Sequence, residues 1–148
     1  MDALITVLFL CTGNSCRSQM AEGWARFLKN DCLQVYSGGI ETHGLNRYAV
    51  QVMAESGVDI SSHLSKSIDA YSHIDFDFVV SVCGHANENC PIFPGKTKIV
   101  HVGFQDPPQL AEEVKNQGGD KNAQLDCYRK VRDQIRAFVE TLPDSLGG

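Results

Sequence analysis

The amino-acid sequence predicts an α/β fold: a single domain built on a four-stranded parallel sheet with helices on both faces. Apolar runs of strand length alternate with segments whose apolar residues recur at helical spacing, the pattern of a sheet joined by crossover helices. The first run, residues 4–10, is apolar at nearly every position, as expected for a central strand that is covered on both faces. No internal repeat or linker divides the chain, so we expect one domain over residues 1–148.

Strand-like and helix-like segments follow one another along the chain. Strands are predicted at residues 4–10, 33–37, 76–82 and 98–102. Helices are predicted at residues 18–29, 46–56 and 123–142, with a short helical segment at 65–71. Gly57 stands where a C-terminal stop of the second helix would be. The polar stretch 107–122, with two adjacent glycines, is interpreted as a surface excursion.

Composition and charge exclude several classes of protein. Hydrophobic residues make up 43% of the chain and charged residues 21%, which is typical of a globular domain. A net charge of −5, with no long basic run, argues against nucleic acid or an anionic membrane as a partner. We find neither a secretory signal nor a run of about 18 apolar residues, so we expect a cytoplasmic protein whose six cysteines are reduced by default.

The candidate binding site lies between the first strand and the first helix. Its sequence is Cys11-Thr12-Gly13-Asn14-Ser15-Cys16-Arg17-Ser18. Successive backbone N–H groups in such a tight loop form a concave nest for an anion, and the helix N-terminus adds its dipole. Arg17 can hold a tetrahedral oxyanion with two N–H groups, and the same field would stabilise a Cys11 thiolate. The bland alternative is a strand–turn–helix connection with an incidental Cys and Arg.

Residues 11–23, CTGNSCRSQMAEG, resemble the signature of the low-molecular-weight phosphotyrosine phosphatase fold, and within it most resemble the thioredoxin-coupled arsenate reductases. The phosphatases usually have Pro at the position of Gln19. The resemblance continues through residues 36–44, YSGGIETHG, to the last helix, and so covers nearly the whole chain. It implies a low-molecular-weight phosphatase-like domain that binds arsenate, with Cys11 as the nucleophile.

The same resemblance assigns Asp106, which precedes Pro107 after the fourth strand, as the general acid. It would protonate the oxygen that leaves the tetrahedral centre. Phosphatases of this fold tend to carry aromatic residues directly after the Asp-Pro pair, whereas this chain has Pro108 and Gln109. An aryl phosphate would therefore find no stacking surface there.

Cys83 and Cys90 complete the predicted chemistry. Reduction of arsenate takes two electrons, and a single thiol cannot close the redox cycle. We expect Cys83 to attack the Cys11 sulfur and release arsenite, and Cys90 then to move the disulfide to Cys83–Cys90. Thioredoxin would reduce that disulfide, with glutaredoxin and glutathione as the alternative reductant. Cys32 and Cys127 are interpreted as structural thiols.

Two other functions fit part of the pattern. One is a phosphatase acting on phosphotyrosine or small aryl phosphates, and weak phosphatase activity is expected even of a reductase. The other is a redox-sensing or oxyanion-sensing module. No cofactor or metal is expected, because the cysteine spacings suit zinc poorly and Arg17 would repel a cation. Relatives that hold a potassium ion near the loop carry Thr-Ser-Asp where this chain has Leu64-Ser65-Lys66.

Overall fold

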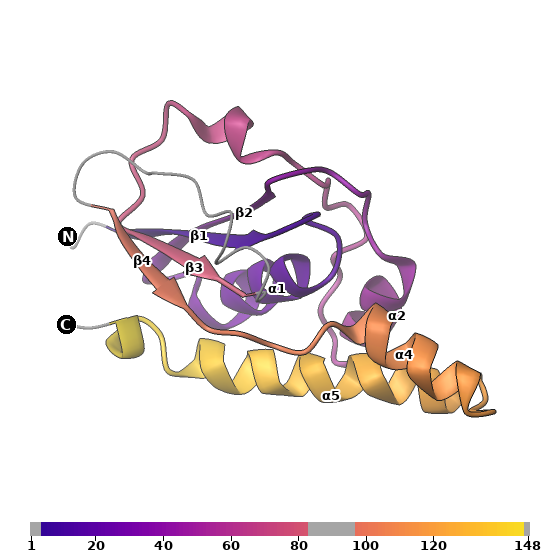
Figure 1. Ribbon diagram of the computed structural model, residues 1–148. Coiled ribbons are helices and arrows are strands. Elements are labelled where there is room, and N and C mark those ends of the chain that lie inside the picture. Colours follow the sequence, from indigo (N-terminus) through magenta and orange to yellow (C-terminus); the bar gives the residue numbers. More distant parts are fainter. Residues whose placement is uncertain (1–3, 83–96, 147–148) are drawn as a thin grey trace.

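The computed structural model describes residues 4–82 and 97–146, which form one α/β domain (Figure 1). Its strands are β1 (Ile5–Cys11), β2 (Leu33–Gly39), β3 (Phe78–Ser81) and β4 (Lys98–His101). All strand pairs are parallel, and the order across the sheet is β2-β1-β3-β4. The predicted fold class is confirmed, and all four strands lie where the apolar runs place them.

Strand β1 occupies the centre of the sheet, as its uniform apolar character predicts. Leu8 pairs with Tyr36 of β2 on one side and with Val79 of β3 on the other. Residues 7–10 are completely buried, because helices and loops cover both faces of this strand. The end of β1 is therefore surrounded by structure on all sides, which fixes the position of the loop that follows it.

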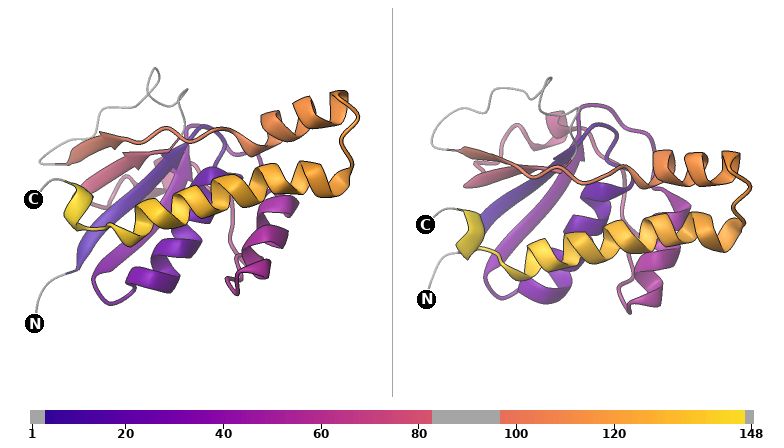
Figure 2. Two further views of the ribbon diagram at one scale, coloured as in Figure 1. Left: turned by 90° about the horizontal axis from the view of Figure 1, so that it is seen from below. Right: turned by 60° about the horizontal axis from the view of Figure 1, so that its bottom comes forward.

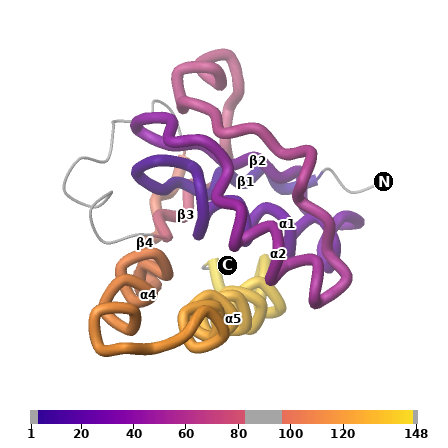
Figure 3. The backbone as a smooth tube through the Cα atoms, turned by 90° about the vertical axis from the view of Figure 1, so that its right-hand side faces the viewer, coloured from indigo at the N-terminus to yellow at the C-terminus, as the bar shows by residue number. Residues whose placement is uncertain are grey.

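Two long helices cover one face of the sheet. Helix α1 (Arg17–Lys29) lies against β1 and β2, and α5 (Lys121–Glu140) packs on α1. Helix α2 (Arg47–Glu55) contacts both. The 3-10 helix η1 (Ile68–Tyr71) lies on the opposite side, above the strands in Figure 3, where the Tyr71 ring packs edge-on against Tyr36. Within the described residues, no helix is long and apolar enough to cross a membrane.

Polar side chains cap the N-termini of α2 and α5, and Gly57 follows α2 as predicted. The Asn46 side chain accepts the N–H groups of Tyr48 and Ala49 at the start of α2, and Asp120 accepts that of Ala123 at the start of α5. Gly57 follows α2 with φ of +83°, a left-handed conformation that glycine adopts without strain. The second and last predicted helices are thus confirmed to within two residues at each end.

The interpretation of residues 107–122 as a surface excursion missed a helix. Helix α4 (Pro107–Asn116) begins at two prolines and lies alongside α5 beyond the edge of the sheet (Figure 2). Only Pro107 and Ala111 of α4 are buried, so its apolar stripe is too narrow to give a periodic signal. The short helix predicted at 65–71 is only the four-residue η1 in the structure, because Ser65 and Lys66 form hydrogen bonds to Gly13 and Asn14 instead.

Candidate active site

The loop from Cys11 to Arg17 (hereafter the oxyanion loop) joins the carboxyl end of β1 to the N-terminus of α1. Because the chain leaves β1 for β2 on one side and β3 lies on the other, this is a switch point of the sheet, where α/β folds bind ligands. Cys11 is the last residue of β1 and is 5% exposed. Cys16 precedes α1, and no side chain caps that helix, so an anion is free to take the place of the cap.

Each carbonyl group of the oxyanion loop from Cys11 to Cys16 accepts a hydrogen bond. The donors, in loop order, are the N–H groups of Ile40, Glu41 and His43, the Gln19 side chain, and the N–H groups of Asn46 and Met20, at 2.9–3.3 Å. Four of these six come from the segment 40–46 that follows β2. The C=O and N–H of one peptide group point in opposite directions. Carbonyls held from outside therefore turn the N–H groups of the loop toward its hollow, which is what an anion nest requires.

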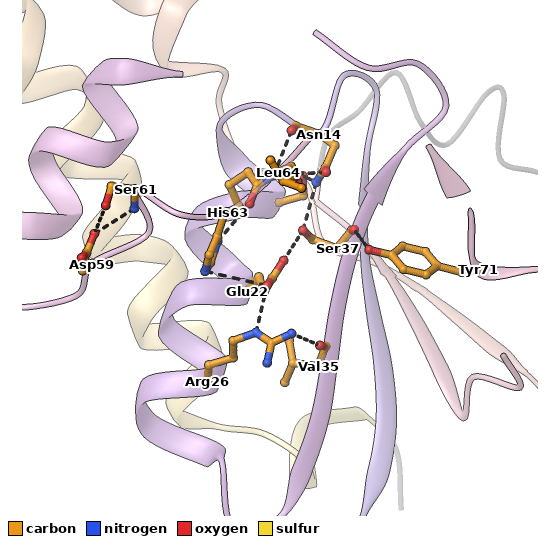
Figure 4. Close-up of polar contacts among 12 residues, drawn as sticks. Asn14, Glu22, Arg26, Val35, Ser37, Asp59, Ser61, His63, Leu64 and Tyr71 are labelled. Atoms are coloured by element: carbon orange, nitrogen blue, oxygen red, sulfur yellow. Dashed lines mark hydrogen bonds and ion pairs between the residues drawn. The ribbon is translucent and has the colours of Figure 1, made fainter. Parts of the chain in front are cut away.

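Asn14 fixes the conformation of the loop through its backbone and its side chain. Its φ of 46° is left-handed, and the residue is fully buried. Its side-chain amide donates to the hydroxyls of Ser18 (2.9 Å) and Ser37 (3.0 Å). Its side-chain oxygen accepts from Gln19 Nε2 (3.1 Å) and from the Lys66 backbone N–H (2.7 Å). With four partners, of which Figure 4 labels Ser37, the side chain is fully satisfied, so it holds the loop rather than pointing at a ligand.

A second layer of polar residues supports Asn14, and sequence reasoning missed it. The Ser37 hydroxyl donates to Glu22, whose other oxygen accepts Nε of Arg26 at 2.8 Å. His63 lies between Gln19 (Nδ1 to Oε1, 3.1 Å) and Glu22 (Nε2 to Oε2, 3.8 Å), as Figure 4 shows for His63 and Glu22. The spacing of Ser18, Glu22 and Arg26, four residues apart on one helix, was the available signal for this layer.

Arg17 and Asp106, both predicted site residues, lie close together in the structure. Arg17 is 8% exposed, donates Nη1 to the Phe104 carbonyl (2.9 Å), and places Nη2 3.5 Å from Asp106 Oδ1. Its Nε is buried and has no partner among the described residues, as a group reserved for a ligand would be. Asp106 stands at the N-cap of α4 without capping it. Pro107 and Pro108 lack N–H groups, so the carboxylate is left to face Arg17.

Cys16 also lies in the oxyanion loop, but the raised pKa of its thiol makes it unsuited to act as a nucleophile. Burial raises the pKa of Cys16 well above its usual range, the nearby Asp106 carboxylate raises it further, and Arg17 only partly opposes them. Cys16 therefore stays protonated at neutral pH. Cys32 and Cys127 are half-buried free cysteines, and their interpretation as structural thiols stays a prediction. Cys83 and Cys90 lie outside the described residues.

The chain matches known proteins over nearly its whole length. The family model of the low molecular weight phosphotyrosine protein phosphatases matches residues 6–147. An arsenate reductase of Bacillus licheniformis is 46% identical, over 92% of this chain and 96% of its own. Arsenate reductase 2 of Staphylococcus epidermidis is 45% identical, over 92% and 94%.

Solved structures give the same result. One of an arsenate reductase in the reduced state is 32% identical, with a TM-score of 0.70 over 97% of this chain and 100% of its own. A low molecular weight protein tyrosine phosphatase from T. tengcongensis is 25% identical, with a TM-score of 0.70 over 95% and 99%. The chain belongs to the low molecular weight phosphotyrosine protein phosphatase family. Its relatives above 40% identity named here are arsenate reductases, so the resemblance seen in residues 11–23 is confirmed.

Proposed function

We propose that this chain is an arsenate reductase, which reduces arsenate to arsenite by a thiol mechanism. The observation that carries the proposal is the oxyanion loop itself, with its carbonyls held from outside and, beside it, the Arg17 Nε, which has no partner among the described residues. Arsenate is a tetrahedral oxyanion that such a nest accommodates. The similarity to arsenate reductases at 45–46% identity supports this choice of oxyanion.

The first step is the attack of the Cys11 thiolate on arsenic, which forms a sulfur–arsenic bond and expels one oxygen. Asp106 donates a proton to that oxygen, which leaves as water, and Arg17 with the loop N–H groups neutralises the remaining negative charge. Ser18 Oγ already accepts a hydrogen bond from Asn14, so its own hydrogen is available to donate to the Cys11 sulfur. This contact would keep Cys11 in its thiolate form.

The second step reduces the arsenic. Cys83 attacks the Cys11 sulfur, the electron pair of the sulfur–arsenic bond passes to arsenic, and arsenite leaves. Cys90 then attacks Cys83, which returns Cys11 as a thiolate and leaves a Cys83–Cys90 disulfide. A dithiol reductant supplies the two electrons that reset the enzyme, and we propose thioredoxin in the cytoplasm. The roles of Cys83 and Cys90 rest on the sequence alone, because both lie outside the described residues.

Phosphatase activity is the second candidate, and the family membership favours it as a side reaction. Phosphate has the shape and charge of arsenate and needs the same nucleophile, arginine and acid. The helix after the acid, however, begins with Pro107, Pro108 and Gln109. None of these offers a flat aromatic surface on which an aryl phosphate could stack. We therefore propose that turnover of aryl phosphates is slow compared with the reduction of arsenate.

Disulfide mapping tests the reductase proposal. Fully reduced protein is treated with arsenate, quenched with an alkylating agent, digested and analysed by peptide mass spectrometry. We expect a Cys83–Cys90 disulfide that forms only with arsenate and is absent from Cys11→Ser. The matched control Cys32→Ser, which alters a half-buried free thiol, should behave as the wild type. Thiols that remain fully alkylated, with no arsenite formed, would refute the proposal.

A further inference from the structure

A cavity of about 420 Å³ lies on the other side of the polar layer that supports the oxyanion loop. It opens between α1, β2 and residues 62–71, and the mechanism proposed above does not use it. Its wall includes Glu22, Arg26, Tyr36, His63, Lys66 and Tyr71. A volume of this size lies in the range of small-molecule sites and exceeds what a bare inorganic oxyanion fills.

The charges on the cavity wall favour an anion. Glu22 is the one carboxylate among the described residues of this wall, and the guanidinium of Arg26, which donates to it at 2.8 Å, balances its charge. Lys66 is exposed, and no carboxylate among the described residues pairs with its ammonium group, which lies 5.9 Å from the centre of the Tyr71 ring. A net positive wall thus remains in a chain whose net charge is −5.

Aromatic rings form the apolar part of the wall. Tyr36 and Tyr71 contact each other with their centroids 5.3 Å apart. The Tyr71 hydroxyl donates to the Ser37 carbonyl at 2.8 Å (Figure 4), so the part of Tyr71 that is left to line the cavity is its ring. Flat rings stack on or pack edge-on against such tyrosines. We propose that this cavity binds a small organic anion that carries a flat aromatic ring, such as an aromatic carboxylate.

The cavity shares residues with the support of the oxyanion loop. Lys66 contributes its side chain to the cavity wall and its backbone N–H to Asn14 Oδ1 at 2.7 Å. Its neighbour Ser65 donates its hydroxyl to the Gly13 carbonyl at 3.0 Å. A ligand that binds the Lys66 side chain therefore contacts a residue whose backbone supports the oxyanion loop, although the ligand itself does not enter the loop.

Binding of 2-naphthoate to the full chain tests the site. Calorimetry should show that Lys66→Met weakens binding about fivefold, the effect of losing one partly exposed ion pair. The matched control Lys115→Met, on the exposed side of α4, should bind as the wild type. Arg17→Met, which removes the cation of the oxyanion loop, should also bind 2-naphthoate normally, which separates this site from the proposed arsenate site.

The neutral analogue 2-naphthalenemethanol tests the role of charge, and it should bind at least about fivefold more weakly than 2-naphthoate. The proposal is overturned if the two compounds bind equally, if Lys66→Met binds as the wild type, or if Arg17→Met abolishes binding. Absence of binding at millimolar 2-naphthoate would also overturn it. None of these outcomes depends on arsenate turnover, so a failure here leaves the reductase proposal untouched.

Discussion

The Asp106 carboxylate lies 3.5 Å from the Arg17 guanidinium, which joins the N-terminus of α4 to that of α1. The N-termini of both helices thus meet at one place, where α4 contributes the Asp106 carboxylate and α1 the Arg17 guanidinium. The Asp106 side chain is 38% exposed, so its carboxyl group remains accessible to an incoming oxyanion and to water. This geometry is the basis of the first prediction.

Asp106→Asn should lower kcat for arsenate reduction by about 100-fold or more, the contribution typical of a general acid. KM for arsenate should change little, because Arg17 and the loop remain. Steady-state kinetics with a thiol reductant system measures both constants. A kcat within roughly threefold of the wild type would show that the leaving oxygen is protonated by another group.

Asn14→Ala should destabilise the fold by about 2–3 kcal/mol, because four hydrogen bonds are lost and alanine is strained at positive φ. Asn14→Gly should recover about 1 kcal/mol of this loss, the backbone part. Urea unfolding measures both variants. Equal stability of the Ala and Gly variants would argue against strain at this residue.

Cys16 should resist alkylation in the folded protein. Its raised pKa keeps the thiolate fraction small across the neutral range, and its sulfur is buried. Iodoacetamide at pH 8 should modify Cys16 at least about tenfold more slowly in buffer than in urea, as followed by peptide mass spectrometry. Similar rates under the two conditions would contradict the assignment.

Glu55→Gln should lower Tm at pH 7 by about 1–3 °C, since a partly exposed ion-pair network ties α2 to α5. The hydrogen bond from Arg129 holds the pKa of Glu55 below its ordinary value of 4.5. A lowered pKa stabilises the fold above the unfolded-state value and stops doing so as pH falls through the folded-state value.

The Tm difference between Glu55→Gln and the wild type should therefore shrink below about pH 4.5 and vanish in stronger acid. Scanning calorimetry over that pH series gives the answer. Glu113→Gln, which alters an exposed carboxylate of α4 with no ion pair among the described residues, is the control. A difference that persists unchanged into acid would show that shape, not charge, matters at Glu55.

Potassium should not raise the rate of arsenate reduction at constant ionic strength. The Asn14 oxygen already accepts from Gln19 and Lys66, and the Glu22 carboxylate from Ser37 and Arg26. Replacing sodium with potassium in the assay measures the effect. A rise in kcat or a fall in KM would mean that an ion displaces one of these contacts.

The sequence was sufficient for the sheet and for the oxyanion loop because both depend on local patterns. Residues 4–10 are apolar at nearly every position, and the Cys11–Arg17 motif places a thiol and a cation at fixed spacing. The support of Asn14 could not be predicted in the same way. Lys66 reaches Asn14 with its backbone, so its side chain carries no signal of the contact.

Gly39 makes another contact with the loop that could not be predicted from the sequence. A Cβ there would lie 2.8 Å from the Thr12 oxygen and the Asn14 nitrogen, so only glycine lets β2 pass behind the loop. The sequence identifies Gly39 as a strand end but not as a neighbour of the loop. Helix α4 was missed for a related reason, since its packing on α5 needs few apolar residues.

The segment 40–46 binds four carbonyls of the oxyanion loop from behind, whereas Asp106, the proposed acid, comes from a distant part of the chain. Shaping the anion nest and supplying the proposed acid are thus assigned to separate stretches of sequence. Selection can alter the second without disturbing the first. The proteins to which this chain is similar accordingly include both phosphotyrosine protein phosphatases and arsenate reductases.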